Sequence, residues 1–339
     1  QPSLLRGGLN LVGRQLGLPL TGVADVPVPG GLSLADLAGY RALERAPLCL
    51  TYRGYRLCSA APPAGGLSVL QAMKFLERFD LKALEAGGGP ESHLVVEALK
   101  LVDADRERWV ADPNFAPVPT AGLLDPAYLA ARGARISADT ALQRPGPGQP
   151  PGALGAVQDG QAFEVPSTSH LVVVDAEGSI ACMTTSVEFG FGAHVMAGGF
   201  LLNNQLTDFA FTPERDGKKV FNSVEPGKRP RSSMAPLVVF DLASGKPVLA
   251  LGSPGGSRIV AYLVQTLVGV LDHGLTLDQA MALPHVVHAG GKAEVEDVGW
   301  RTPQARDAVV EALKRRGQEV VLAPENSGLH GAALGVDLA

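Results

Sequence analysis

Apolar residues recur at every third or fourth position in several stretches of the chain, which is the spacing of one face of an α-helix. This spacing predicts helices over residues 67–79, 92–110 and 303–316. Residues 259–271 are almost continuously apolar and predict a helix that is buried in the core.

The N-terminal region carries weaker signals. A slight helical tendency reaches Leu16, and a helix is predicted from Ser33 to about Leu43. The second prediction rests on Ser33 and Asp36, which have the spacing of a capping box.

Strand-like segments that alternate with turn residues dominate the second half of the chain. The run His170–Asp175 and the segment Ser179–Thr185 flank a short glycine-containing turn, which predicts a hairpin. Further strands are predicted at 52–59, 237–241, 247–252 and 319–322. Hairpins flanked by helices are typical of an antiparallel sheet covered by helices. The fold class is therefore α+β and not a doubly wound parallel sheet.

Residues 143–160 are rich in proline and glycine and predict a solvated, flexible connector. The character of the sequence changes directly after this segment, where the predicted hairpin begins.

Composition narrows the class of protein. The 339 residues are 46% hydrophobic and 19% charged, which is typical of a globular chain. The net charge is −5 and no basic stripe is present, so nucleic-acid binding is excluded. The longest apolar run, residues 259–271, is shorter than the roughly 20 residues that a membrane span needs, so no span is expected.

The cysteines and histidines suggest no metal or disulfide framework. Cys49, Cys58 and Cys182 are odd in number and lack a C-x-x-C spacing, so each is expected to be a small buried side chain. His285 and His288 are expected to be structural, and no metal or organic cofactor is predicted. The chain begins at Gln1 without a signal peptide, so we expect either a removed targeting segment or a natural start elsewhere.

Thr168 stands at the end of the connector and at the start of a buried strand. One interpretation is that Thr168 and its neighbours make local hydrogen bonds at the strand edge. The other is a latent N-terminal nucleophile. If the peptide bond between Ser167 and Thr168 is cut, the threonine hydroxyl becomes the nucleophile and its new α-amino group the base.

Three further segments carry groups that suit an active site. The glycines in 252–258, between a strand and a helix, can form an anion nest or oxyanion hole, or simply a tight turn. Ser232 and Ser233 can donate to a carboxylate or cap a strand. Residues 203–208, rich in Asn and Asp, can hold an ammonium group or merely turn the chain.

In order and spacing, the motifs resemble those of γ-glutamyltranspeptidase (glutathione hydrolase). The resemblance to its small subunit rests on Thr168–Gly178, Thr184–Ser186, Leu201–Phe209, Pro226–Met234 and Gly252–Gly256. The later part of its large subunit is resembled by Gly30–Tyr40, Tyr52–Tyr55 and Pro62–Gly66.

The resemblance implies an N-terminal nucleophile hydrolase with an αββα sandwich, incomplete at its N-terminal part. It also implies a proenzyme that cleaves itself between Ser167 and Thr168. Residues 1–167 would then be the later part of the large subunit and 168–339 the small, catalytic subunit, both in one body.

The resemblance also assigns roles within the site. Thr168 is the nucleophile and Ser186 its hydrogen-bonding neighbour. Gly255 and Gly256 would stabilise the oxyanion. Glu188, Gln205 and Asp208 would bind the substrate ammonium, and Ser232 and Ser233 the substrate carboxylate.

This chain departs from the family pattern at several points. Glu188 stands where many members have Asn, and the segment from Asp208 to Pro226 is short, which implies a reduced lid. The first half of the large subunit, with its carboxylate-clamping arginine, has no counterpart, nor does the usual tail after His330. Arg53 and Arg258 are candidates to replace that arginine.

The implied reaction is cleavage of the γ-glutamyl amide of glutathione or a related compound, with transfer to water or to an amino-acid or peptide acceptor. One alternative is an acylase of the same family that acts on a glutaryl amide or poly-γ-glutamate. Asp208 and Gln205 favour the γ-glutamyl group, since a glutaryl group has no amine. A second alternative is a truncated, weakly active or inactive remnant. Family resemblance suggests a periplasmic or secreted protein, whereas the missing signal peptide leaves a cytoplasmic one open.

Overall fold

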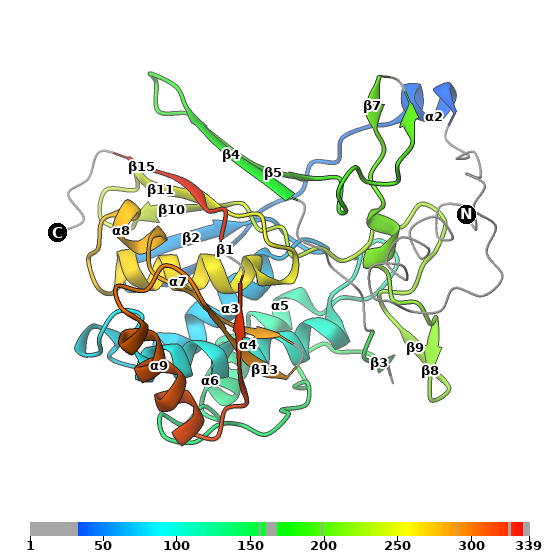
Figure 1. Cartoon of the computed structure of the whole chain (residues 1–339). Coiled ribbons are helices and arrows are strands. Elements are labelled where there is room, and N and C mark those ends of the chain that lie inside the picture. Colours follow the sequence, from blue (N-terminus) through cyan, green and yellow to red (C-terminus); the bar gives the residue numbers. More distant parts are fainter. Residues whose placement is uncertain are drawn as a thin grey trace.

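A five-stranded antiparallel sheet lies at the centre of the molecule (Figure 1). The computed structural model describes residues 33–155, 157–160, 168–197, 199–289, 291–324 and 327–334. In sheet order the strands are β1 (Leu48–Tyr52), β2 (Tyr55–Ser59), β10 (Leu237–Asp241), β11 (Pro247–Gly252) and β15 (His330–Ala333). The sheet therefore combines strands from before and after Thr168.

Helices cover one face of this sheet (Figure 1). α3 (Gly66–Leu76) and α7 (Ile259–Leu271) lie on the sheet, and α4 (Gly89–Trp109) packs against both of them. All three helices agree well with prediction. Leu263 and Leu267 of α7 are fully buried, because a helix this apolar gains free energy only inside the core. The remaining helices are α2 (Leu34–Gly39), α5 (Thr120–Leu123), α6 (Pro126–Gly133), α8 (Leu277–Met281) and α9 (Pro303–Arg315).

The predicted hairpin, β4 (Thr168–Val174) with β5 (Ile180–Ser186), packs on the other face of the sheet (Figure 1). Its inward side chains include Cys182, whose Sγ lies 3.7 Å and 3.6 Å from the carbonyl oxygens of Leu237 and Leu251. Helices, sheet and hairpin form three layers, which confirms the α+β class. Among the described residues no helix covers the hairpin's outer face, where apolar side chains are exposed, namely Leu171, Val173 and Met183.

Smaller elements surround these layers. A three-stranded sheet packs against α4 and consists of β12 (Val286–Ala289), β13 (Lys292–Glu296) and β14 (Val320–Ala323). The short strands are β3 (Val157–Gln158), β6 (Met196–Ala197), β7 (Phe200–Leu201), β8 (Glu214–Arg215) and β9 (Lys218–Val220). The 3₁₀ turns are η1 (Leu81–Ala83), η2 (Gln205–Asp208) and η3 (Gly256–Arg258).

The prediction of one strand over 52–59 was wrong. The segment is the second half of a hairpin, β1–β2, whose turn is Arg53–Gly54 with φ angles of 53° and 104°. Cys49 and Cys58 are cross-strand partners in this hairpin and form a disulfide, so the expectation of three free, buried cysteines was also wrong. Cys182 is free and half-buried.

The interpretation of 143–160 as a solvated, flexible connector holds only in part: several of its described residues are exposed, but others are held against the helices. Gly148 donates its N–H to Asp105 at 2.7 Å, and its carbonyl accepts from the indole of Trp109 at 3.0 Å. Val157 is buried in β3. The segment is fixed against α4 because its backbone groups satisfy buried polar side chains.

Helix α2 has the predicted Ser33–Asp36 capping box but ends at Gly39. The helical tendency up to Leu16, the Gly30 end of the first motif and Ser167 lie outside the described residues. Within the described part of the chain, no helix combines the length and the apolar character needed to cross a membrane.

Candidate active site

Thr168 is the first residue of β4 and faces Ser186, the last residue of β5, across the hairpin. The Thr168 hydroxyl donates to Oγ of Ser186 at 3.2 Å. The backbone N–H of Glu188 donates to the same oxygen at 2.8 Å. The register of the hairpin thus places the predicted nucleophile and its predicted partner in contact.

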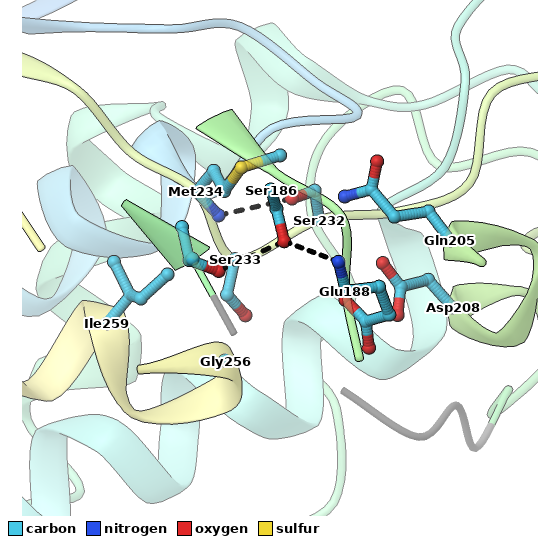
Figure 2. A pocket seen from close by; sticks show the side chains of 10 residues that line it. Ser186, Glu188, Gln205, Asp208, Ser232, Ser233, Met234, Gly256 and Ile259 are labelled. Atoms are coloured by element: carbon cyan, nitrogen blue, oxygen red, sulfur yellow. Dashed lines mark hydrogen bonds between the residues drawn. The ribbon is translucent and has the colours of Figure 1, made fainter. Parts of the chain in front are cut away.

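One small pocket gathers the predicted site residues (Figure 2). All of the predicted catalytic and substrate-binding residues line it except Gly255, and two apolar side chains complete it. The lining consists of Thr168, Ser186, Glu188, Gln205, Asp208, Ser232, Ser233, Met234, Gly256 and Ile259. Residues up to 91 positions apart, from Thr168 to Ile259, meet here only through the fold, so no single motif contains the site.

The loop after β5 holds Glu188 in an unusual backbone conformation. Its φ angle is 74°, in the left-handed region that Gly and Asn accept more readily than Glu. Asn204 holds this loop in place, because its Oδ1 accepts from the N–H of Phe189 at 2.9 Å and its own N–H donates to Val187 at 3.2 Å. Strained residues of this kind gather at functional sites.

Asp208 ends the turn η2 and is 2% exposed. The buried amide of Asn222 connects it to the opposite wall of the pocket. Nδ2 of Asn222 donates to the carbonyl of Asp208 at 2.7 Å, while its Oδ1 accepts from the N–H of Arg231 at 3.0 Å. Asn222 therefore fixes the spacing between the acidic turn and the loop that carries Ser232 and Ser233.

The loop that carries the two serines packs backbone to backbone against the Pro62–Gly66 turn. Ser232 donates its N–H to Pro63 at 2.9 Å, and Gly65 donates its N–H to Met234 at 2.9 Å. A Cβ atom at Gly65 would lie 2.4 Å from the Ser233 carbonyl oxygen, so only glycine permits this approach.

Gly255 and Gly256 form the turn between β11 and α7, with φ angles of 136° and 56°. The first of these angles suits glycine alone. Consecutive residues of this kind at the start of a helical segment direct backbone N–H groups toward one point, which suits a developing negative charge. Gly256 lines the pocket directly.

His170 lies two residues after Thr168, on the inward face of β4. Nδ1 is 2.8 Å from Oγ1 of Thr184, and Nε2 is 3.4 Å from Sγ of Cys182. Burial, reinforced by the nearby His330, lowers the pKa of His170 to about 4. The imidazole is therefore neutral near pH 7 and supports the hairpin from beneath.

Histidines and carboxylates elsewhere form pairs. His285 Nδ1 lies 3.3 Å from Glu296, and His288 Nδ1 lies 2.6 Å from Asp103. Among the described residues, no group of three His, Cys, Asp or Glu side chains is arranged to hold a metal ion.

The two arginines considered as replacements for the family's clamp lie elsewhere. Arg53 pairs with Asp272 at 3.0 Å, and Arg258 pairs with Glu294 at 2.7 Å. Neither is among the described residues that line the pocket. Sequence reasoning missed Arg106, whose Nη2 donates to Oγ of Ser233 at 3.0 Å. Its one available signal was a charged position near the end of a largely buried helix.

Charge is distributed unevenly around the pocket. In Figure 2, Glu188, Gln205 and Asp208 lie on one side of Ser186, whereas Ser233 lies on the other. The first group offers carboxylates and an amide to a cation. The second offers a hydroxyl, backed by a guanidinium, to an anion. The pocket thus suits a ligand that carries both an ammonium and a carboxylate.

The sequence model of the gamma-glutamyltranspeptidase family matches residues 21–336. The chain belongs to the γ-glutamyltranspeptidase family. This confirms the resemblance that the motifs carried, and it makes the chain a relative of N-terminal nucleophile hydrolases.

Individual members of the γ-glutamyltranspeptidase family agree with this assignment. The chain is 34% identical over 317 residues to the glutathione hydrolase proenzyme of Escherichia coli, which covers 91% of this chain and 52% of the relative. It is 35% identical over 322 residues to the acylase ACY 1 proenzyme of a Pseudomonas species, covering 94% and 53%. The chain spans about half the length of these curated relatives.

A solved structure shares the fold. The cephalosporin acylase from Bacillus halodurans superposes with a TM-score of 0.73 at 24% identity, over 95% of this chain and 52% of that one. The chain therefore shares its fold with an enzyme that is named a cephalosporin acylase.

Proposed function

We propose that the protein cleaves γ-glutamyl amides through an acyl-enzyme on Thr168. The observation that carries the proposal is the pocket itself. It joins a threonine–serine hydroxyl pair to a carboxylate-rich wall and a serine-rich wall. A γ-glutamyl group has an amide carbonyl at one end and an α-ammonium with an α-carboxylate at the other, so it matches all three features.

Activation would begin with self-cleavage between Ser167 and Thr168. The Thr168 hydroxyl attacks the carbonyl carbon of Ser167, the C–N bond breaks, and an ester to Oγ1 forms while the nitrogen takes the proton. Water then hydrolyses the ester. The products are two pieces, 1–167 and 168–339, and a free α-amino group on Thr168 that can act as base.

In the catalytic cycle, the α-amino group takes the proton of the Thr168 hydroxyl as its oxygen attacks the γ-carbonyl carbon. The N–H groups of the Gly255–Gly256 turn stabilise the oxyanion. The amine leaves with a proton, and the γ-glutamyl ester passes to water or to an amino acid or peptide. Ser186 holds the nucleophile, whereas Asp208, Gln205 and Glu188 bind the ammonium and Ser232 and Ser233 the carboxylate.

The donor substrate in this proposal is glutathione or a related γ-glutamyl compound, in keeping with the glutathione hydrolase relative. A second candidate is an acylase activity, which the 35% identity to an acylase proenzyme supports. The two differ in their need for an amine on the acyl group, and Asp208 favours the γ-glutamyl substrate.

The test combines intact mass and turnover of γ-glutamyl-p-nitroanilide. The purified protein is expected to yield two pieces that begin at residues 1 and 168, and to release nitroaniline. Thr168→Ala should remain one inactive chain, whereas Thr168→Ser should still be cut and turn over, because it keeps a hydroxyl. A Thr168→Ala protein that is cut or active would overturn the proposal, as would an inert Thr168 protein.

A further inference from the structure

Arg106 lies outside the pocket lining and contacts one of its residues, Ser233. It lies in the last turn of α4, and its Nη2 atom donates to Oγ of Ser233 at 3.0 Å. Ser233 is 3% exposed and lines the pocket. A hydrogen bond from a cation to a buried hydroxyl is charge-assisted and stronger than one between neutral groups.

A second contact fixes the serine loop to the same residue. The side chain of Arg231 donates from Nη1 to the carbonyl of Arg106 at 3.1 Å and from Nη2 to the carbonyl of Gly160 at 2.9 Å. Arg231 is 2% exposed, so this anchor is shielded from water. The position of Ser233 relative to the Arg106 guanidinium is thus set by both the backbone and the side chain of Arg106.

This geometry has a consequence for the Ser233 proton. A serine hydroxyl has one proton and two acceptor lone pairs. Because one lone pair accepts from the guanidinium, electrostatics turns the proton away from Arg106, and the pocket lies on the open side of Ser233. The Ser233 hydroxyl is then oriented to donate a hydrogen bond to an anion in the pocket, and the positive charge of the Arg106 guanidinium strengthens that bond.

We infer that Arg106 is a positioning residue for the substrate carboxylate, acting through Ser233 without touching the substrate. This inference rests on the proposed function and deepens it. It explains how the serine-rich wall of the pocket can bind a carboxylate, and it gives this wall a charge opposite to that of the carboxylate-rich wall with Glu188 and Asp208.

The test uses three p-nitroanilides. The γ-glutamyl anilide has both charged groups, the glutaryl anilide lacks the ammonium, and the 4-aminobutyryl anilide lacks the α-carboxylate. Arg106→Gln should raise KM for the first two by about 10-fold, the equivalent of one charge-assisted hydrogen bond, with kcat within about twofold. KM for the 4-aminobutyryl anilide should not change.

Two further variants separate positioning from structural support. Arg106→Lys keeps the charge and should recover part of the loss. Ser233→Ala should show the same substrate pattern, and the Arg106→Gln/Ser233→Ala double variant should be no worse than Ser233→Ala alone, because Arg106 acts through Ser233. Binding of free L-glutamate and 4-aminobutyrate by calorimetry provides a readout that needs no turnover.

The matched control is Arg108→Gln, two residues along the same helix, where the guanidinium pairs with Asp159 at 2.6 Å instead. It should leave all three KM values unchanged. If Arg106→Gln weakens the three anilides equally, or none of them, the inference is wrong while the proposed function stands. If the unsubstituted protein turns over none of them, the proposed function is wrong and the inference falls with it.

Discussion

Ser186 lies directly opposite Thr168 in the β4–β5 ladder and accepts a hydrogen bond from its hydroxyl at 3.2 Å. A shift of one residue in this register would turn every inward side chain outward, so the hairpin sets the contact. Ser186 also accepts from the N–H of Glu188, which ties the nucleophile to the ammonium side of the pocket.

Ser186→Ala should therefore slow both self-cleavage and turnover. Without the Ser186 oxygen, the Thr168 hydroxyl and the Glu188 N–H each lose their acceptor, at a cost of about 1–3 kcal/mol, which corresponds to about 5- to 150-fold in rate. Ser186→Thr retains the hydroxyl and should stay within about threefold of the unsubstituted rate. Thr185→Ala, on the outer face of the same strand, is the control. Denaturing electrophoresis and γ-glutamyl-p-nitroanilide kinetics measure the two effects, and unaltered rates for Ser186→Ala would rule out the role.

Asp208→Asn should lower kcat/KM for γ-glutamyl-p-nitroanilide by about 10- to 100-fold, because a charge-assisted contact with the ammonium is lost. The glutaryl anilide, which lacks the ammonium, should lose less than about threefold. Asp216→Asn in the exposed β8–β9 turn provides the control. Equal losses on both anilides would show that Asp208 supports structure and would favour the acylase alternative.

Substitutions at Glu188 should reveal the strain in its backbone. With φ at 74°, Asn is tolerated, whereas the β-branched Val is not. Both variants remove the carboxylate, so the difference between their free energies of unfolding isolates the backbone effect. In the Thr168→Ala background, which remains one chain and can refold, we expect Glu188→Val to be less stable than Glu188→Asn by about 1–2 kcal/mol in urea titration. Equal stabilities would mean that the loop relaxes out of the left-handed region.

His170 should make stability depend on pH. Its pKa in the folded protein is about 4, below the ordinary value of 6.5, so the unfolded chain binds its proton more readily. Its contribution is complete above about pH 6.5 and is lost as the pH falls toward 4, by on the order of 2 kcal/mol. His170→Gln should flatten that part of the curve relative to the unsubstituted protein. Parallel Tm profiles between pH 4 and 7 would contradict this.

Much of the fold follows from local patterns. The strands at 237–241 and 247–252 and the helix at 259–271 match the structure at both ends, since each has clear periodicity and a turn at its border. The hairpin turn at Arg53–Gly54 was not predicted, because Arg is an unusual residue at a first turn position with a positive φ angle. The missed disulfide is the same error, because Cys49 and Cys58 face each other only once that turn is placed.

Some residues of the candidate site could be predicted from the sequence, and others could not. Residues such as Thr168 and Asp208 stand in recognisable motifs, so their side chains could be named from the sequence. Asn222 acts through a backbone carbonyl 14 residues earlier in the chain, and Arg106 acts through a hydroxyl 127 residues later. Such contacts form only when the loop with Ser232 and Ser233 has packed in the folded chain, so no spacing in the sequence predicts them.

The central sheet has a consequence for how the protein could be made. Its β2–β10 ladder joins segments on either side of Thr168 through five registered residue pairs. Before a cut at Thr168 this ladder forms within one molecule, but afterwards its re-formation is a second-order encounter between two pieces, dependent on concentration. A cut protein that is once denatured should refold poorly on dilution, whereas Thr168→Ala should refold at any concentration. The order of events, folding before cutting, would thus be built into the sheet.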